Sequence, residues 1–156
     1  NVNYERTRRR GVELEAESQP CPKVRLFANL TLMDPELLDG PYDGNPIPGI
    51  APRSGSAGLT FLPTGTLTFD LRCNWVDDKT MVNDWTAADP SWGGSYVVVD
   101  AKLSFTPVKP LTFYVGVNNL FDEQYAEYGI CRPDGLWVYP SPGRNVVAGV
   151  KITKEF

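Results

Sequence analysis

Three acids that follow a strand-like segment are the residues best suited to chemistry in this sequence. Asp122, Glu123 and Glu127 lie within the stretch NNLFDEQYAEY. Paired carboxylates can act as general acid and base, or they can supply oxygen ligands to a cation. Their spacing does not match an EF-hand loop, and no nucleophile or base accompanies them. We therefore interpret the stretch as a polar strand-to-loop junction, where Asn118 and Asn119 bond the neighbouring backbone.

Composition removes several classes of protein. The 156 residues contain no histidine, which excludes a Ser-His-Asp triad and a His-ligated zinc site. Cys21, Cys73 and Cys131 lack the CxxC spacing of a zinc ribbon or a redox motif. The formal net charge of -4 argues against nucleic-acid binding. We expect no catalytic residue, no metal site and no cofactor.

Aromatic residues and one arginine form a second group with chemical potential. They lie in two polar segments: Tyr125, Tyr128, Arg132, Trp137, Tyr139, Trp85 and Trp92. Arginine and aromatic rings suit a planar anionic ligand, such as an aryl or catecholate ferric chelate. The same side chains also suit ordinary loop packing, and the residues alone leave both interpretations open.

The elements that must position these side chains are β-strands. Apolar residues alternate with other residues over seven segments, which predicts about seven strands. In 67–76, for example, Leu67, Phe69 and Leu71 fall on one face, and the opposite face is wholly polar. The other segments are 11–18, 24–33, 55–62, 96–105, 111–118 and 145–156. We expect at most one helical turn, in 34–40.

Short, proline-rich links alternate with long polar links along the chain. The short links are 19–23, 62–65 and 106–110, and the long ones are 34–52, 77–95 and 119–144. An outer-membrane barrel has short periplasmic turns and long extracellular loops, whereas a soluble sandwich has no reason to keep that alternation. A soluble barrel with its apolar face inside is the alternative, because alternation does not distinguish inside from outside.

Aromatic residues on the apolar face favour lipid on the outside. The members of this group near the short links are Phe61, Phe105, Phe113 and Phe156, and those near the long links are Trp75 and Phe121. Two such girdles mark the two interfaces of a membrane. Because single-chain bacterial barrels have even strand numbers, seven strands predict an all-β, antiparallel portion of a larger transmembrane barrel.

Four motifs carry a resemblance to a known family. They are RRRGVELEAESQP (8–20), GNPIPGIAPRSGSAGLTF (44–61), VGVNNLFDEQYAEYG (115–129) and YPSPGRNVVAGVKITKEF (139–156). Together they resemble the C-terminal part of the β-barrel of TonB-dependent outer-membrane receptors, including its NLFDxxY signature and its closing PGR strand. The resemblance covers nearly the whole chain.

The resemblance implies a barrel of usually about 22 strands around an N-terminal plug, in the outer membrane of a Gram-negative bacterium. Residues 1–156 are then only the C-terminal part, with the plug and the earlier strands outside this chain. The implied partners are outer-membrane lipid, the rest of the barrel and plug, TonB through the missing N-terminal part, and a ferric siderophore, cobalamin or similar chelate. The isolated segment, with two open edges, is expected to self-associate. A complete small β-barrel binding module, in the outer membrane or soluble, is the alternative.

Overall fold

The computed structural model describes residues 6–86 and 94–153, and these residues form an all-β structure. They contain nine strands, one short 3-10 helix (η1, Gly40–Tyr42) and no α-helix. The strands are β1 (Thr7–Cys21), β2 (Val24–Leu37), β3 (Arg53–Phe61), β4 (Leu67–Val76), β5 (Tyr96–Val108), β6 (Leu111–Asn118), β7 (Ala126–Arg132), β8 (Gly135–Pro140) and β9 (Asn145–Ile152). Within the described ranges, no helix is long and apolar enough to cross a membrane.

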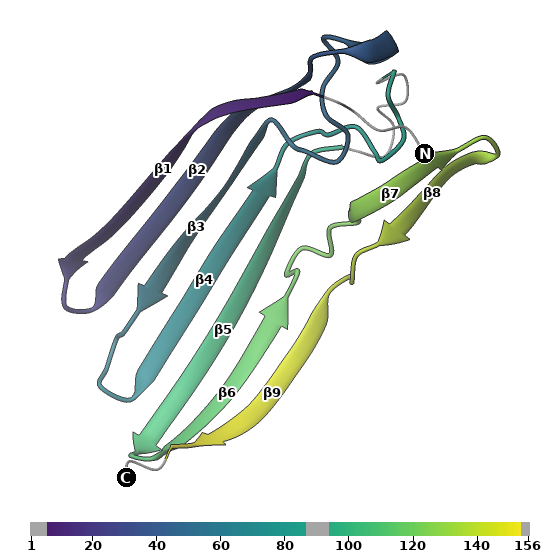
Figure 1. Cartoon of the computed structure of the whole chain (residues 1–156). Coiled ribbons are helices and arrows are strands. Elements are labelled where there is room, and N and C mark those ends of the chain that lie inside the picture. Colours follow the sequence, from purple (N-terminus) through teal and green to yellow (C-terminus); the bar gives the residue numbers. More distant parts are fainter. Residues whose placement is uncertain (1–5, 87–93, 154–156) are drawn as a thin grey trace.

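Seven of the strands form one antiparallel sheet, which confirms the predicted fold class. Their order is β1-β2-β3-β4-β5-β6-β9, so each strand pairs with its predecessor except where the hairpin β7–β8 intervenes. Figure 1 shows the sheet as a wall of tilted strands with β1 and β9 at its two edges. Because these edges do not pair within the described residues, the sheet is an unclosed portion of a barrel. The alternative of a complete small barrel is therefore wrong for this sheet.

The predicted alternation of links is confirmed. Tight turns join β1 to β2, β3 to β4 and β5 to β6 at one end of the sheet (Figure 1). Long segments follow β2, β4 and β6 at the opposite end, which we call the loop end. The side chains proposed for ligand contact that the structure describes belong to segments of the loop end.

In the long segments, the expected upper limit of one helical turn holds, and the expectation of a plain loop over 119–144 is corrected. No helical turn forms at Asp34–Leu37, because these residues extend β2 and pair with Thr7–Arg10 of β1; η1 begins later, at Gly40. The link 119–144, expected to be only a loop, contains the hairpin β7–β8. Pro133 and Asp134 separate its paired ends, Arg132 and Gly135.

Strand register gives the sheet one apolar face and one polar face. Leu59, Leu71, Ala101 and Val117 are successive partners across β3 to β6. In the next row the partners are Thr60, Asp70, Lys102 and Gly116. Successive residues of a strand point to opposite sides of the sheet. The apolar residues of every strand therefore share one face, and the polar residues share the other.

No other part of the described chain covers the apolar face of the sheet. Leu14, Phe113 and Val150 keep 56%, 44% and 56% of their surface exposed. The buried hydrophobic side chains of the described residues lie instead at the loop end, and they are Leu37, Met81, Val98 and Ala126. A single-layer sheet cannot cover its own faces, so the apolar side needs a cover from outside this chain.

Candidate ligand-binding site

The NNLFD stretch forms a clamp at the loop end of β6. The side chain of Asn119, which is 3% exposed, accepts a hydrogen bond from the main-chain N of Glu123 at 2.8 Å. Its Nδ2 donates to the main-chain oxygens of Glu123 at 2.9 Å and Pro142 at 3.3 Å. The φ angle of Asn119 is 52°, a left-handed conformation that asparagine tolerates better than most residues. Asn119 thus fixes both ends of the last long segment.

Two neighbouring side chains complete this clamp. Asp122 Oδ1 accepts a hydrogen bond from the main-chain N of Arg144 at 2.8 Å, and Asn118 Nδ2 donates to Asn145 Oδ1 at 2.8 Å. The predicted polar junction is therefore confirmed, although Asn118 bonds a side chain rather than the backbone. Among the described residues, no group of three or more His, Cys, Asp or Glu is arranged to hold a metal ion.

Hydrogen bonds also join the long segments to one another. The main-chain N of Val82 donates to Gly129 O at 3.1 Å, and the N of Cys131 donates to Val82 O at 2.8 Å. This places Val82 beside β7 as a short parallel bridge. The preceding residue, Met81, is 2% exposed, and a Cβ on Gly129 would lie 3.0 Å from its sulfur. The segment after β4 and the hairpin therefore form one packed unit.

Four of the predicted contact residues come together on the hairpin β7–β8. The ring centroids of Tyr128 and Tyr139 are 5.5 Å apart. The guanidinium carbon of Arg132 lies 5.2 Å from the ring centroid of Trp137, within the range of a cation–π contact. The rings of Tyr128, Trp137 and Tyr139 remain about half exposed. They form an accessible aromatic surface with one cation, which we call the hairpin surface.

The other predicted contact residues lie elsewhere. Tyr125 packs against Tyr96, with 4.4 Å between ring centroids. Trp85 stacks on Tyr42 at 6.3 Å and thus belongs to the packing between two long segments. Trp92 lies outside the described residues. The role of this set in ligand binding stays a prediction, and the structure divides the set among separate places.

The predicted interface aromatics lie at both ends of the strands. Those at the tight-turn end are Phe61, Phe105 and Phe113, with 40%, 44% and 44% of their surface exposed. Those at the loop end are Trp75 and Phe121, and Phe121 is 72% exposed. Phe156 lies outside the described residues. Contact of these rings with lipid stays a prediction.

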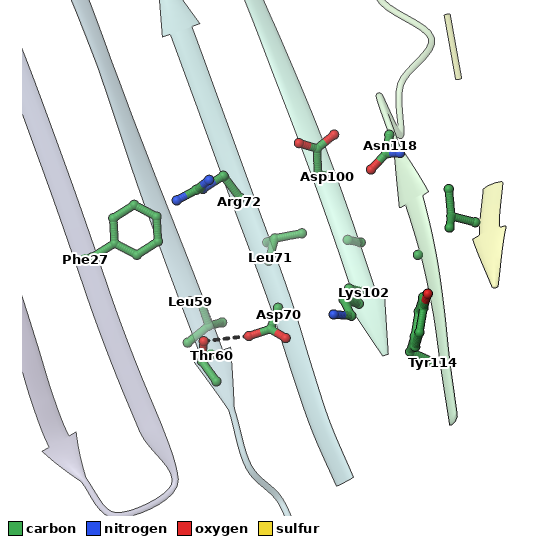
Figure 2. Close-up of a pocket in the computed structure, with 13 residues that line it drawn as sticks. Phe27, Leu59, Thr60, Asp70, Leu71, Arg72, Asp100, Lys102, Tyr114 and Asn118 are labelled. Carbon is green, nitrogen blue, oxygen red and sulfur yellow. Dashed lines mark hydrogen bonds between the residues drawn. The ribbon is translucent and has the colours of Figure 1, made fainter. Parts of the chain in front are cut away.

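The polar face carries a hollow of about 450 Å³ (Figure 2). Charges alternate across it, because Asp70 pairs in register with Lys102, and Arg72 pairs with Asp100. Within the described residues, no ion pair joins these four side chains. Asp70 instead accepts a hydrogen bond from Thr60 Oγ1 at 2.7 Å. The two cations, Arg72 and Lys102, contact aromatic rings.

Both cations of this hollow lie over aromatic rings that were not among the predicted contact residues. Arg72 is 5.1 Å from the ring centroid of Phe27, and Lys102 Nζ is 5.0 Å from that of Tyr114. The register partner of Phe27 is Gly58, where a Cβ would overlap the ring. Glycine inside a strand often marks such a close approach, so Gly58 was the available sequence signal.

Comparisons with known proteins agree with this architecture. A sequence model of the family described as "TonB dependent receptor-like, beta-barrel" matches residues 1–120. The pesticin receptor of Yersinia enterocolitica is 27% identical over 148 residues, which are 91% of this chain and 21% of that protein. The chain therefore spans about a fifth of the length of this relative.

Solved structures share the fold. The siderophore receptor PiuA from Acinetobacter baumannii gives a TM-score of 0.80 at 22% identity, covering 92% of this chain and 21% of that one. The ferric yersiniabactin uptake receptor FyuA from Yersinia pestis gives a TM-score of 0.77 at 24% identity, covering 92% of this chain and 23% of that one.

Proposed function

We propose, because the chain belongs to the TonB-dependent receptor β-barrel family, that it is the C-terminal barrel segment of an outer-membrane receptor. Such a receptor would take up a ferric siderophore or a similar chelate with energy from TonB. The plug, the contact with TonB and the earlier strands would belong to parts of the protein outside these residues. Proteins of this family are receptors and transporters, and we infer no catalysis by this chain.

The observation that carries the proposal is the sheet with two unlike faces. Its apolar face is exposed along the strands, as lipid contact requires, while charges and amides line the opposite face. A soluble protein rarely leaves so large an apolar surface open. The tight turns would then face the periplasm and the loop end would face the outside, where a ligand arrives.

The hairpin surface supports a planar, anionic chelate as the ligand. Arg132 supplies a positive charge over Trp137, and Tyr128 and Tyr139 supply exposed ring faces beside it. Aromatic rings and arginine bind planar anions through stacking and charge. The similar structures support a ferric chelate in general, since FyuA is a ferric yersiniabactin uptake receptor and PiuA is a siderophore receptor.

Uptake of radioactive metal tests the proposal, with labelled iron in the siderophores and labelled cobalt in cobalamin. The full-length receptor is expressed in a Gram-negative host without its own iron receptors, and ferric catecholates, other ferric siderophores and cobalamin are supplied separately. We expect uptake of one chelate class that stops when TonB is deleted. The proposal would be contradicted if uptake continued without TonB. It would also be contradicted if none of these chelates were taken up.

Substitutions on the hairpin surface locate the contact. Trp137→Ala should weaken chelate binding by about 2-fold to 30-fold, the range expected for one cation–π or stacking contact. Phe121→Ala, which removes an exposed ring outside the hairpin, is the matched control and should leave the affinity unchanged. If the two substitutions weaken chelate binding equally, the hairpin surface is not part of the binding site.

A further inference from the structure

A second polar hollow, of about 420 Å³, lies on the polar face at the loop end, and we call it the mouth pocket. Its lining includes Asn74, Tyr96, Asp100, Asn118, Tyr125 and Glu127. These residues come from β4, β5, β6, the segment that leads into β7, and β7 itself, which contains Glu127. The pocket therefore lies where the last long segment joins the strands.

Two polar side chains of the mouth pocket take no part in the hydrogen bonds of the described residues. Asp100 Oδ1 accepts a hydrogen bond from the main-chain N of Asn119 at 2.9 Å, so this acid serves the clamp. By contrast, no hydrogen bond or ion pair within the described part of the chain engages the Glu127 carboxylate or the Asn74 amide. Lys79 Nζ approaches Glu127 but donates to its main-chain oxygen, at 2.8 Å. The Glu127 carboxylate thus remains available to a ligand.

The charge of the lining selects the kind of group that fits. The lining contains two carboxylates, Asp100 and Glu127, and no lysine or arginine. An anionic group would be repelled there, whereas a cation would gain from both acids. Tyr96 and Tyr125, packed at 4.4 Å, add electron-rich ring faces that attract cations. The hairpin surface differs, because there Arg132 lies over Trp137, whose Nε1 also donates to Asp134 Oδ1 at 3.3 Å.

We propose that the mouth pocket binds a primary ammonium group of the transported ligand, through the Glu127 carboxylate and the Tyr96–Tyr125 pair. The inference rests on the proposed function, since it assigns part of the ligand to this pocket. The chelate at the hairpin surface and the amine in the mouth pocket would be two ends of one molecule. The receptor would then favour chelates with a free amine over chelates without one.

Binding of three small probes of equal length tests the pocket directly. The probes are 1,4-diaminobutane, 1,4-butanediol and succinate, which differ in charge but hardly in size. Their affinities for the purified full-length receptor are measured by saturation-transfer NMR in a low-salt buffer, because salt screens exposed charges. We expect the diamine to bind at least tenfold more tightly than the diol or succinate.

Matched variants assign the effect to the pocket. Glu127→Gln should weaken diamine binding by about fivefold, the upper end for an exposed ion pair. Glu15→Gln removes the same charge from the polar face of β1, far along the sheet, and should change the affinity less than twofold. Tyr125→Leu should also weaken the diamine without affecting the diol. Circular dichroism and melting temperature confirm that each variant is folded.

The outcomes separate this inference from the proposed function. Equal binding of diamine and diol, or equal effects of Glu127→Gln and Glu15→Gln, would overturn the mouth pocket as an amine site. If iron uptake then still depends on TonB, only this inference fails. If the diamine binds as expected but no chelate is taken up, the pocket is an amine site, but the proposed uptake and the assignment of the amine to a transported chelate both fail.

Discussion

Removal of the Asn119 side chain is the most direct test of the clamp at the loop end. Asn119→Ala deletes hydrogen bonds to the main-chain N and O of Glu123 at 2.8 and 2.9 Å, and a longer one to Pro142 O. Because Asn119 is 3% exposed, no water replaces these bonds without a rearrangement. The last long segment should then open more often.

The expected free-energy cost of Asn119→Ala is the sum of two contributions. Loss of two good hydrogen bonds at a buried position costs about 2 kcal/mol. Alanine at a φ of 52° costs about 1 kcal/mol more, because the short polar side chain of asparagine stabilises the left-handed conformation through local hydrogen bonds and a methyl group does not. The total of about 3 kcal/mol corresponds to roughly a hundredfold increase in the population of the opened segment.

Hydrogen exchange of the full-length receptor measures this opening. A useful reporter is the Ser141 amide, which donates to Tyr125 O at 2.9 Å and is not bonded to Asn119. Asn119→Gly separates the two terms, because glycine tolerates the left-handed conformation and should cost about 1 kcal/mol less than alanine. Asn118→Ala is the matched control, since it removes one exposed bond to Asn145 and should cost about 0.5 kcal/mol.

Two results would refute the reasoning. If Asn118→Ala accelerates exchange as much as Asn119→Ala does, burial does not decide the importance of the two asparagines. If Asn119→Gly is as costly as Asn119→Ala, the left-handed backbone contributes nothing. Exchange that changes only at β5 and β6 would place the effect in the sheet rather than in the clamp.

Three further predictions concern the sheet. In lipid refolding titrations of the full-length receptor, Leu71→Arg on the apolar face should cost about 2–4 kcal/mol and Asp70→Asn little, and equal costs would reverse the assigned faces. Gly58→Val should displace the Phe27 ring and lower the free energy of unfolding in urea by about 1–3 kcal/mol. The loss should be smaller when Phe27 is already replaced by alanine. An equal loss in both backgrounds would mean that the ring does not lie over Gly58. The isolated chain should self-associate through the edges β1 and β9 in light scattering, and a monodisperse monomer without detergent would contradict the open-edge interpretation.

The strands could be predicted because alternation is a local property. Leu67, Phe69 and Leu71 mark one face whatever their neighbours are, and β4 spans Leu67–Val76, the segment expected. The hairpin β7–β8 was missed because Tyr128 and Ile130 lie among turn residues and acids. Its position also depends on distant pairing, as in the bridge between Val82 and Ile130.

The candidate site depended more strongly on tertiary structure. The aromatic residues Tyr125, Trp85 and Trp137 belonged to one predicted set, but they lie against Tyr96, Tyr42 and Arg132 respectively. Composition alone cannot place rings that are tens of residues apart in the chain. The mouth pocket was invisible for the same reason, since its lining comes from several strands.

The sequence by itself determined an all-β chain with two unlike faces, tight turns at one end and a polar junction at NNLFDEQY. These features follow from the period of a strand and from the hydrogen-bonding habits of single residues. Tertiary structure decided that Asn119 rather than Asn118 is buried and that Arg72 and Lys102 contact aromatic rings. It also decided that the Glu127 carboxylate lies in the lining of the mouth pocket. Each of these depends on register between strands, because a shift of one residue would exchange the two faces.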